Sequence, residues 1–99
     1  MNKVFFQLGS NLGNREQLLT EAISLISEEI GEVIISSPIY ESSPWRVDGQ
    51  DNYLNQVIQI KTKFSSTETL TKALDIEARL GRLRVEKWGE RLIDIDIIF

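Results

Sequence analysis

The chain has 99 residues, of which 41% are hydrophobic and 26% charged, and its formal net charge is −4. Cysteine and histidine are both absent, which excludes disulfides and argues against zinc sites and histidine acid–base catalysis. The acidic balance argues against a general nucleic-acid binder, and no apolar run approaches the roughly 20 residues of a membrane span. We therefore expect one cytoplasmic domain over residues 1–99, working with carboxylates, cationic side chains and a hard metal ion if it is an enzyme.

The first third of the chain predicts a strand and a helix. Residues 3–8 form the strand, and one of its faces is apolar, with Val4, Phe6 and Leu8. A Gly- and Asn-rich turn follows, and Asn14 with Gln17 has the spacing of a capping box that opens a helix. Gly31 is the expected end of this helix. Its expected apolar stripe consists of Leu18, Leu19, Ala22, Ile23, Ile26 and Ile30.

Two strands are predicted in the middle of the chain. Residues 32–37 are rich in β-branched side chains, and Pro38 indicates an edge strand or a bulge. A polar connection follows that is longer than a hairpin needs. The third strand covers residues 53–63 and has one core face and one largely open face. The expected core side chains are Leu54, Ile58, Ile60 and Phe64; the open face carries Tyr53, Asn55, Gln59, Lys61 and Lys63.

A second helix and a fourth strand complete the chain. Ser65 with Glu68 forms another capping-box pattern, and the helix is expected to run to about Leu80 and to end at Gly81. We expect its buried stripe to comprise Leu70, Ala73, Leu74 and Leu80, with Glu77 within that stripe. In the last strand, Ile93, Ile95, Ile97 and Phe99 are expected to face the core, and Asp94 and Asp96 the opposite side.

The order β-α-β-β-α-β predicts an α+β fold of the ferredoxin-like class. In this sandwich, two helices pack on one face of a four-stranded antiparallel sheet. The other face is open, and it would carry Asp94 and Asp96.

The paired aspartates are the first candidate for chemistry. Alternation places their carboxylates side by side, roughly 6.6 Å apart along the backbone, where like charges repel unless a cation lies between them. Mg²⁺ prefers oxygen ligands of this kind, and two metal ions about 4 Å apart could share the pair. The alternative is an ordinary solvated strand face.

Cationic and aromatic side chains supply further candidates. Three arginines, Arg82, Arg84 and Arg91, flank the aspartates in sequence and would suit a polyphosphate, or else pair with neighbouring glutamates in a solvated loop. The LGSNLGN turn could hold an anion at a helix N-terminus, or be a plain capped turn. Glu77 could contact a ligand or pair with an arginine. A group of aromatic and amide side chains could bind a flat heterocycle or simply pack: Trp45, Tyr53, Asn55 and Trp88.

Taken together, four stretches resemble the 6-hydroxymethyl-7,8-dihydropterin pyrophosphokinase family: LGSNLG, SSPIYESSP, YLNQVI and IEARLGRLRVEKWGERLIDIDIIF. The last is the most specific. The family pattern there is approximately E-x-x-x-G-R-x-R, a short basic loop, W-G-x-R and D-[LI]-D. It fits at Glu77, Gly81, Arg82, Arg84, Trp88, Gly89, Arg91, Asp94 and Asp96.

The resemblance implies Mg²⁺-dependent transfer of pyrophosphate from ATP to the hydroxymethyl group of the pterin, with AMP as the other product. It implies that Asp94 and Asp96 hold two Mg²⁺ ions and that Arg82 and Arg91 stabilise the transferred group. Binding of the pterin is implied for Ser42, Ser43, Trp45, Tyr53 and Asn55. Binding of the nucleotide is implied for Asn11, Glu77, Arg84 and Trp88, of which Arg84 and Trp88 would belong to a loop that closes over the site.

This chain departs from the family in its length. Family members usually continue beyond the fourth strand with a segment that supplies a histidine, basic side chains and an aromatic residue. The chain is therefore expected to be the ferredoxin-like core without that segment. We expect a monomer for the full enzyme, with self-association of this chain as an alternative. The alternative function is a small ligand-binding or regulatory module that self-associates.

Overall fold

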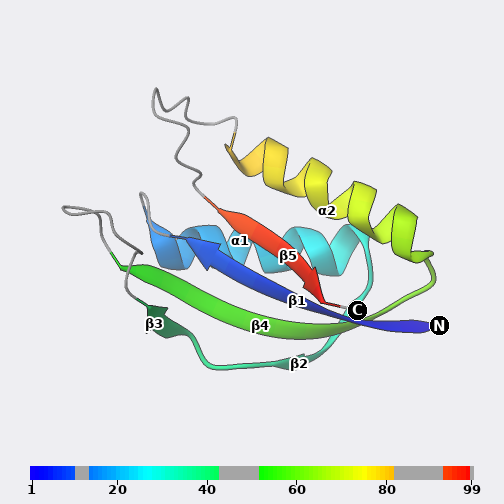
Figure 1. Ribbon diagram of the computed structural model, residues 1–99, viewed down its shortest axis with the longest axis horizontal. Coiled ribbons are helices and arrows are strands. Elements are labelled where there is room, and N and C mark those ends of the chain that lie inside the picture. Colours follow the sequence, from blue (N-terminus) through cyan, green and yellow to red (C-terminus); the bar gives the residue numbers. More distant parts are fainter. Residues whose placement is uncertain (11–13, 43–51, 82–92, 99) are drawn as a thin grey trace.

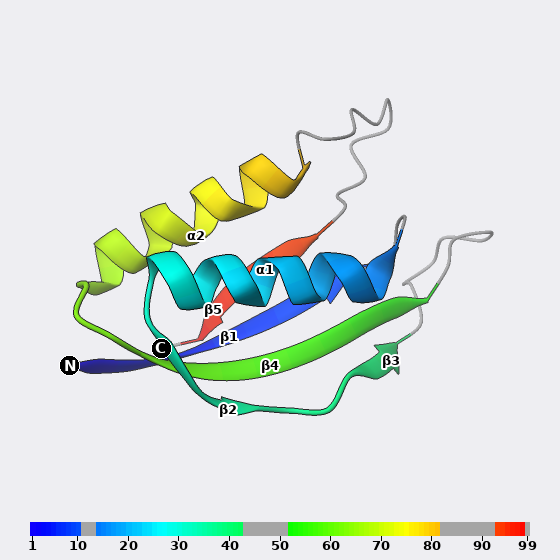
Figure 2. The ribbon, with the colours of Figure 1, turned by 180° about the vertical axis from the view of Figure 1, so that it is seen from behind.

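The computed structural model describes residues 1–10, 14–42, 52–81 and 93–98, which form an antiparallel sheet with two helices on one face (Figure 1). The view from behind shows both helices lying over the same side of the strands (Figure 2). This is the ferredoxin-like α+β arrangement that the sequence predicts. Its elements are β1 (Asn2–Ser10), α1 (Arg15–Glu29), β2 (Glu32–Ser36), β3 (Tyr40–Ser42), β4 (Tyr53–Thr62), α2 (Ser66–Gly81) and β5 (Asp94–Ile98).

The sheet has five strands rather than the predicted four, because its outer strand is interrupted. The order is β2-β4-β1-β5, and β3 also pairs with β4. Pro38 cannot donate a backbone hydrogen bond, and it lies in the break between β2 and β3. Ser37 bridges the break: its N–H donates to the Val57 carbonyl over 2.8 Å, and its hydroxyl accepts from the Val57 N–H over 2.9 Å. The predicted edge strand is confirmed, with its register shift upstream, between Val33 and Ile35.

Helix α1 begins and packs as predicted. The Asn14 side chain caps it by accepting from the Gln17 N–H over 3.1 Å. The reciprocal half of the capping box is replaced by another bond, since Gln17 donates from its side chain to Glu21 over 3.0 Å. Its inner face is apolar: Leu19, Ala22, Ile26 and Ile30 are buried, and Leu18 and Ile23 pack against them.

Gly31 is required after α1 because the chain passes very close to β4. A Cβ atom at this position would lie 2.1 Å from the Lys61 carbonyl oxygen, so backbone would have to move. The adjacent Thr62 hydroxyl donates to the Ile30 carbonyl over 2.7 Å and joins the same two segments. The sequence correctly placed the helix end at Gly31, but the physical reason is this close approach.

Helix α2 has the predicted capping box, but its buried stripe was partly wrong. The Ser65 N–H donates to Glu68 over 3.0 Å, and the Glu68 N–H donates to the Ser65 hydroxyl over 3.1 Å. Leu70 and Leu74, expected in the core, are 46% and 52% exposed. The predicted Ala73 and Leu80 are buried, and Thr69 and Ile76 take the place of the two leucines.

Relative to the prediction, α2 is rotated about its own axis, and polar contacts near the end of the helix accompany this rotation. Arg79 forms an ion pair with Glu29 of α1, and Glu77 accepts a hydrogen bond from β5. One residue corresponds to about 100° around a helix, so turning these two side chains toward their partners carries the leucines outward. None of the helices in the described ranges is long and apolar enough to cross a membrane.

Candidate functional site

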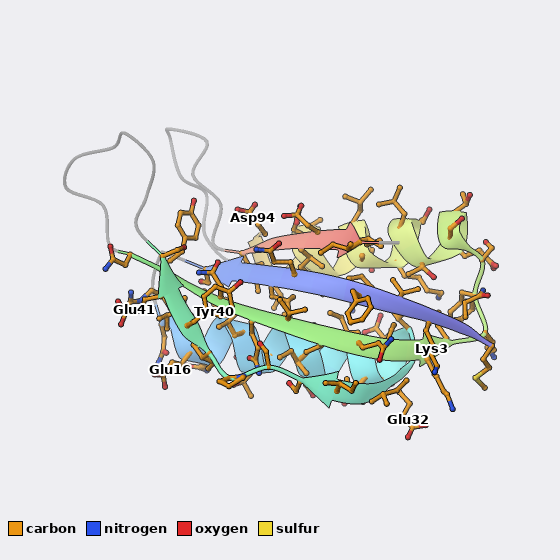
Figure 3. The ribbon with its side chains drawn as sticks, turned by 60° about the horizontal axis from the view of Figure 1, so that its bottom comes forward. Lys3, Glu16, Glu32, Tyr40, Glu41 and Asp94 are labelled. Carbon is orange, nitrogen blue, oxygen red and sulfur yellow. The ribbon has the colours of Figure 1, made fainter. Side chains whose placement is uncertain are left out.

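Polar side chains meet on the open face of the sheet, in register across four strands. Asp94 on β5 is paired with Gly9 on β1, Gly9 with Asn55 on β4, and Asn55 with Tyr40 on β3. In the next row, Asp96 is paired with Gln7. Figure 3 shows Asp94 and Tyr40 toward one end of this face, with Lys3 and Glu32 toward the other end. We refer to the Asp94–Gly9–Asn55–Tyr40 row and the adjoining Asp96 and Gln7 as the polar half.

The two aspartates are on the face that the sequence predicts. Ile95 between them is only 6% exposed and belongs to the core, so alternation turns both carboxylates to the open side. Asp94 is half-buried and Asp96 is exposed. Within the described ranges, no group of three or more carboxylates is close enough to hold a metal ion together. A pair of carboxylates fits Mg²⁺, which usually completes its octahedron with water and phosphate oxygens.

Asn55 lies on the predicted face, but it is not open to solvent. It is 8% exposed and is paired with Tyr40 of β3. Its amide nitrogen donates to the Ser42 hydroxyl over 2.8 Å and to the Tyr40 carbonyl over 3.3 Å. These contacts use both amide hydrogens and fix the side chain. The group that remains for a ligand is therefore the amide oxygen, Oδ1.

Gly9 lies between Asn55 and Asp94 in this row and leaves the sheet surface there without a side chain. A Cβ atom at this position would lie 3.2 Å from Asn55 Oδ1 and 3.6 Å from Tyr53 Cδ1. A side chain here would therefore press on Asn55 and touch Tyr53. The sequence predicted a turn at Gly9, but Gly9 lies within β1, where a glycine is a signal of close approach by a ligand or another backbone.

Glu77 has a partner that the sequence did not predict. The backbone N–H of Ile95 donates to Glu77 Oε2 over 2.7 Å, so the carboxylate is tied to β5. Sequence reasoning considered a ligand or an arginine of the following loop as its partner, and did not consider a strand edge.

Seven predicted site residues lie outside the described residues: Asn11, Ser43, Trp45, Arg82, Arg84, Trp88 and Arg91. The described residues beside them lie near the polar half. Ser10 and Ser42 end β1 and β3, and Asp94 begins β5. The end of α2 lies at this side of the sheet as well (Figure 1). The structure therefore brings together five predicted residues on the open face, Ser42, Tyr53, Asn55, Asp94 and Asp96, with Glu77 at the edge of β5.

Comparison with known proteins gives a consistent result. The sequence profile of the 7,8-dihydro-6-hydroxymethylpterin-pyrophosphokinase (HPPK) family matches residues 5–99. The 2-amino-4-hydroxy-6-hydroxymethyldihydropteridine pyrophosphokinase of Aquifex aeolicus is 41% identical over 98 residues, which cover 99% of this chain and 61% of that protein. The enzyme of the same name from Bacillus subtilis is 37% identical, over 98% of this chain and 59% of that protein. The chain thus spans about three fifths of these curated relatives. It belongs to the HPPK family.

Proposed function

We propose that this member of the HPPK family carries the sheet-borne part of an active site that transfers pyrophosphate from ATP to 6-hydroxymethyl-7,8-dihydropterin in folate biosynthesis. Family membership and the names of the relatives support the reaction class. The chain spans about three fifths of those relatives, so the activity of the whole enzyme is part of the proposal.

The observation that carries the proposal is the register of Asp94, Gly9 and Asn55. The first and last of these are two strand spacings apart, about 10 Å across the sheet. One end of this row offers negative oxygen ligands, the other a fixed amide, and the middle has no side chain. A bicyclic heterocycle bearing a hydroxymethyl group fits such a row if its ring lies near Asn55 and its hydroxyl points toward Asp94.

Recognition of the pterin would depend on Asn55 and Gly9. With its amide hydrogens bonded to β3, Asn55 offers Oδ1 as an acceptor to a ring N–H or amino group. The absence of a side chain at Gly9 lets a flat ring lie close to the strand, beside Tyr53. Ser42, Ser43 and Trp45 would complete the pocket.

The reaction forms one bond and breaks another at the β-phosphorus of ATP. The hydroxymethyl oxygen bonds to that phosphorus and loses its proton, and the bond to the oxygen shared with the α-phosphate breaks, so that AMP leaves. Asp94 and Asp96 would hold two Mg²⁺ ions, which neutralise phosphate charge and make the hydroxyl easier to deprotonate. The chain itself contributes positioning: Asn55 orients the acceptor while the aspartates orient the nucleotide.

Cationic side chains would balance the remaining charge. Arg82 and Arg91 would contact the transferred group, where charge must be neutralised in the transition state. Asn11, Arg84 and Trp88 would contact the rest of the nucleotide. Arg82 follows α2 directly in sequence, and Arg91 is three residues before Asp94.

Calorimetric titration with a non-hydrolysable ATP analogue, with and without Mg²⁺, tests the proposal. We expect Mg²⁺-dependent binding by the wild-type chain and its loss in Asp94→Asn/Asp96→Asn. The matched control is Glu28→Gln/Glu32→Gln, which also removes two carboxylates, one near the end of α1 and one at the start of β2, away from the polar half, and it should bind like wild type. Equal binding by both double variants, or none by the folded wild-type chain, would contradict the proposal.

A further inference from the structure

The contact between Glu77 and β5 has no part in the proposed chemistry. The Ile95 N–H donates to Glu77 Oε2 over 2.7 Å, and Ile95 stands between Asp94 and Asp96. We propose that Glu77 is a positioning residue: it holds the backbone between the two aspartates so that both carboxylates face the same metal–nucleotide complex. The inference rests on the proposed function of the aspartate pair, and it gives Glu77, which the family resemblance assigns to the nucleotide, a role that acts through the backbone.

The position of β5 explains why such a contact is useful. Among the described strands, β5 pairs with β1 alone, so only one of its edges is held by a ladder of backbone bonds. It is also only five residues long. A short edge strand is held by few bonds and opens easily. The Glu77 carboxylate supplies a bond to a backbone N–H, and a charged acceptor makes it stronger than a bond between neutral groups.

The bond fixes the aspartates because of where it falls. The Ile95 N–H belongs to the peptide unit that also contains the Asp94 carbonyl, and a peptide unit is planar. Holding that unit on α2, while the Ile95 side chain is held in the core at 6% exposure, restricts the backbone angles that direct Asp94. Ligand carboxylates held in advance bind a metal more tightly than ones that must be ordered on binding.

Glu77 is well placed to provide this support. Ile76 and Leu80 on either side of it are 0% and 5% exposed, so this part of α2 is anchored in the core. The helix lies on the face opposite the Asp94 carboxylate (Figure 3). Within the described part of the chain, Glu77 does not join Asp94 and Asp96 in a three-carboxylate group that could hold a metal ion. The contact that links it to the aspartate pair is the hydrogen bond from the Ile95 N–H.

The test measures affinity for Mn²⁺ with a non-hydrolysable ATP analogue, using Mn²⁺ as a spectroscopic substitute for Mg²⁺. We expect Glu77→Ala to weaken binding about 10-fold, at the lower end of effects for residues that orient metal ligands. Glu77→Asp keeps the charge but is one methylene shorter, so it should lose a similar amount. Glu77→Gln keeps an oxygen acceptor at the right length and should remain within about threefold of wild type.

Two controls separate positioning from charge and from helix stability. Asp75→Asn removes a carboxylate from the same helix but leaves the β5 contact, and should bind like wild type. Ser65→Ala removes the cap at the far end of α2 and lowers the melting temperature, but it should keep its affinity. Wild-type affinity in both Glu77→Ala and Glu77→Asp, or an equal loss in Ser65→Ala, would overturn the inference. Absence of binding by the wild-type chain would instead contradict the proposed function, and the inference would fall with it.

Discussion

The two halves of the open sheet face are built on the same strands, yet their chemistry is different. The polar half has Asp94, Gly9 and Asn55 in one row. At the other end, the row of Ile98, Phe5, Gln59 and Ile35 is mostly apolar, and we call it the apolar half. Its three apolar side chains are exposed by 47%, 42% and 58% for Ile98, Phe5 and Ile35.

The comparison shows that the polar half is not simply the solvent side of a sheet. A solvated face requires neither a buried amide nor a glycine within a strand. At Asn55, the side chain is buried and both amide hydrogens are bonded to β3. At Gln59, four residues along the same strand and face, the side chain is half-buried in an apolar row. The difference favours a built site in the polar half.

The largest effect that distinguishes the halves is expected at Asn55. Asn55→Leu should weaken binding of a 6-hydroxymethylpterin analogue by about 100-fold, because it removes an oriented acceptor and leaves ligand donors unpaired. It should also lower the free energy of unfolding by about 1–2 kcal/mol through the lost bonds to β3. Gln59→Leu is the matched control and should bind normally. Fluorescence titration of both variants makes the comparison, and equal losses would remove the distinction between the halves.

A smaller effect is expected when a side chain is added at Gly9, between the proposed positions of the nucleotide and the pterin. Gly9→Ala would place a methyl group 3.2 Å from Asn55 Oδ1 and should weaken pterin binding about 10-fold, with little change in stability. Gly31→Ala should do the reverse, since its methyl group meets backbone. It should lower the free energy of unfolding by about 3 kcal/mol while the folded fraction binds normally. Denaturant unfolding and ligand titration of the two variants separate these outcomes; normal pterin binding by Gly9→Ala would argue against a ligand above this strand.

Changes in the apolar half should leave nucleotide binding almost unaltered. We expect Phe5→Ser/Ile35→Ser to bind the Mg²⁺–ATP analogue within about twofold of wild type, because neither residue belongs to the polar half. Calorimetry at matched concentrations of folded protein measures this directly. A loss as large as that at the aspartates would mean that the nucleotide extends over the whole open face.

The smallest effect is a pH dependence in the helix layer behind both halves. The hydrogen bond from Arg79 lowers the pKa of Glu29 below its usual value of 4.5. A lowered carboxyl pKa contributes stability that is present above the usual pKa and lost as the pH falls through the lowered one. Glu29→Gln should therefore be slightly less stable than wild type at pH 7, and the two should converge in acid. Melting temperatures between pH 7 and pH 3 test this; a difference that grows toward low pH would be inconsistent with the ion pair.

The sequence predicted the features that depend on local periodicity. Alternation placed Asp94 and Asp96 on the open face, and the caps at Asn14 and Ser65 located both helix starts. It did not predict which strand residues are neighbours across the sheet, so the role of Gly9 and the burial of Asn55 became visible only with the register. For α2, hydrophobicity favoured Leu70 and Leu74, whereas the helix rotation goes with contacts to α1 and β5 that are distant in sequence.

The most direct measurement is a map of backbone amide chemical shifts in the ¹⁵N-labelled chain, titrated with the Mg²⁺–ATP analogue and then with a pterin analogue. The account predicts nucleotide-dependent shifts near Asp94 and Asp96, followed by pterin-dependent shifts near Gly9 and Asn55. The amides of Phe5, Ile35 and Ile98 should change little. Shifts concentrated at those three residues, or the same shifts in Asp94→Asn/Asp96→Asn, would contradict the placement of the active site in the polar half.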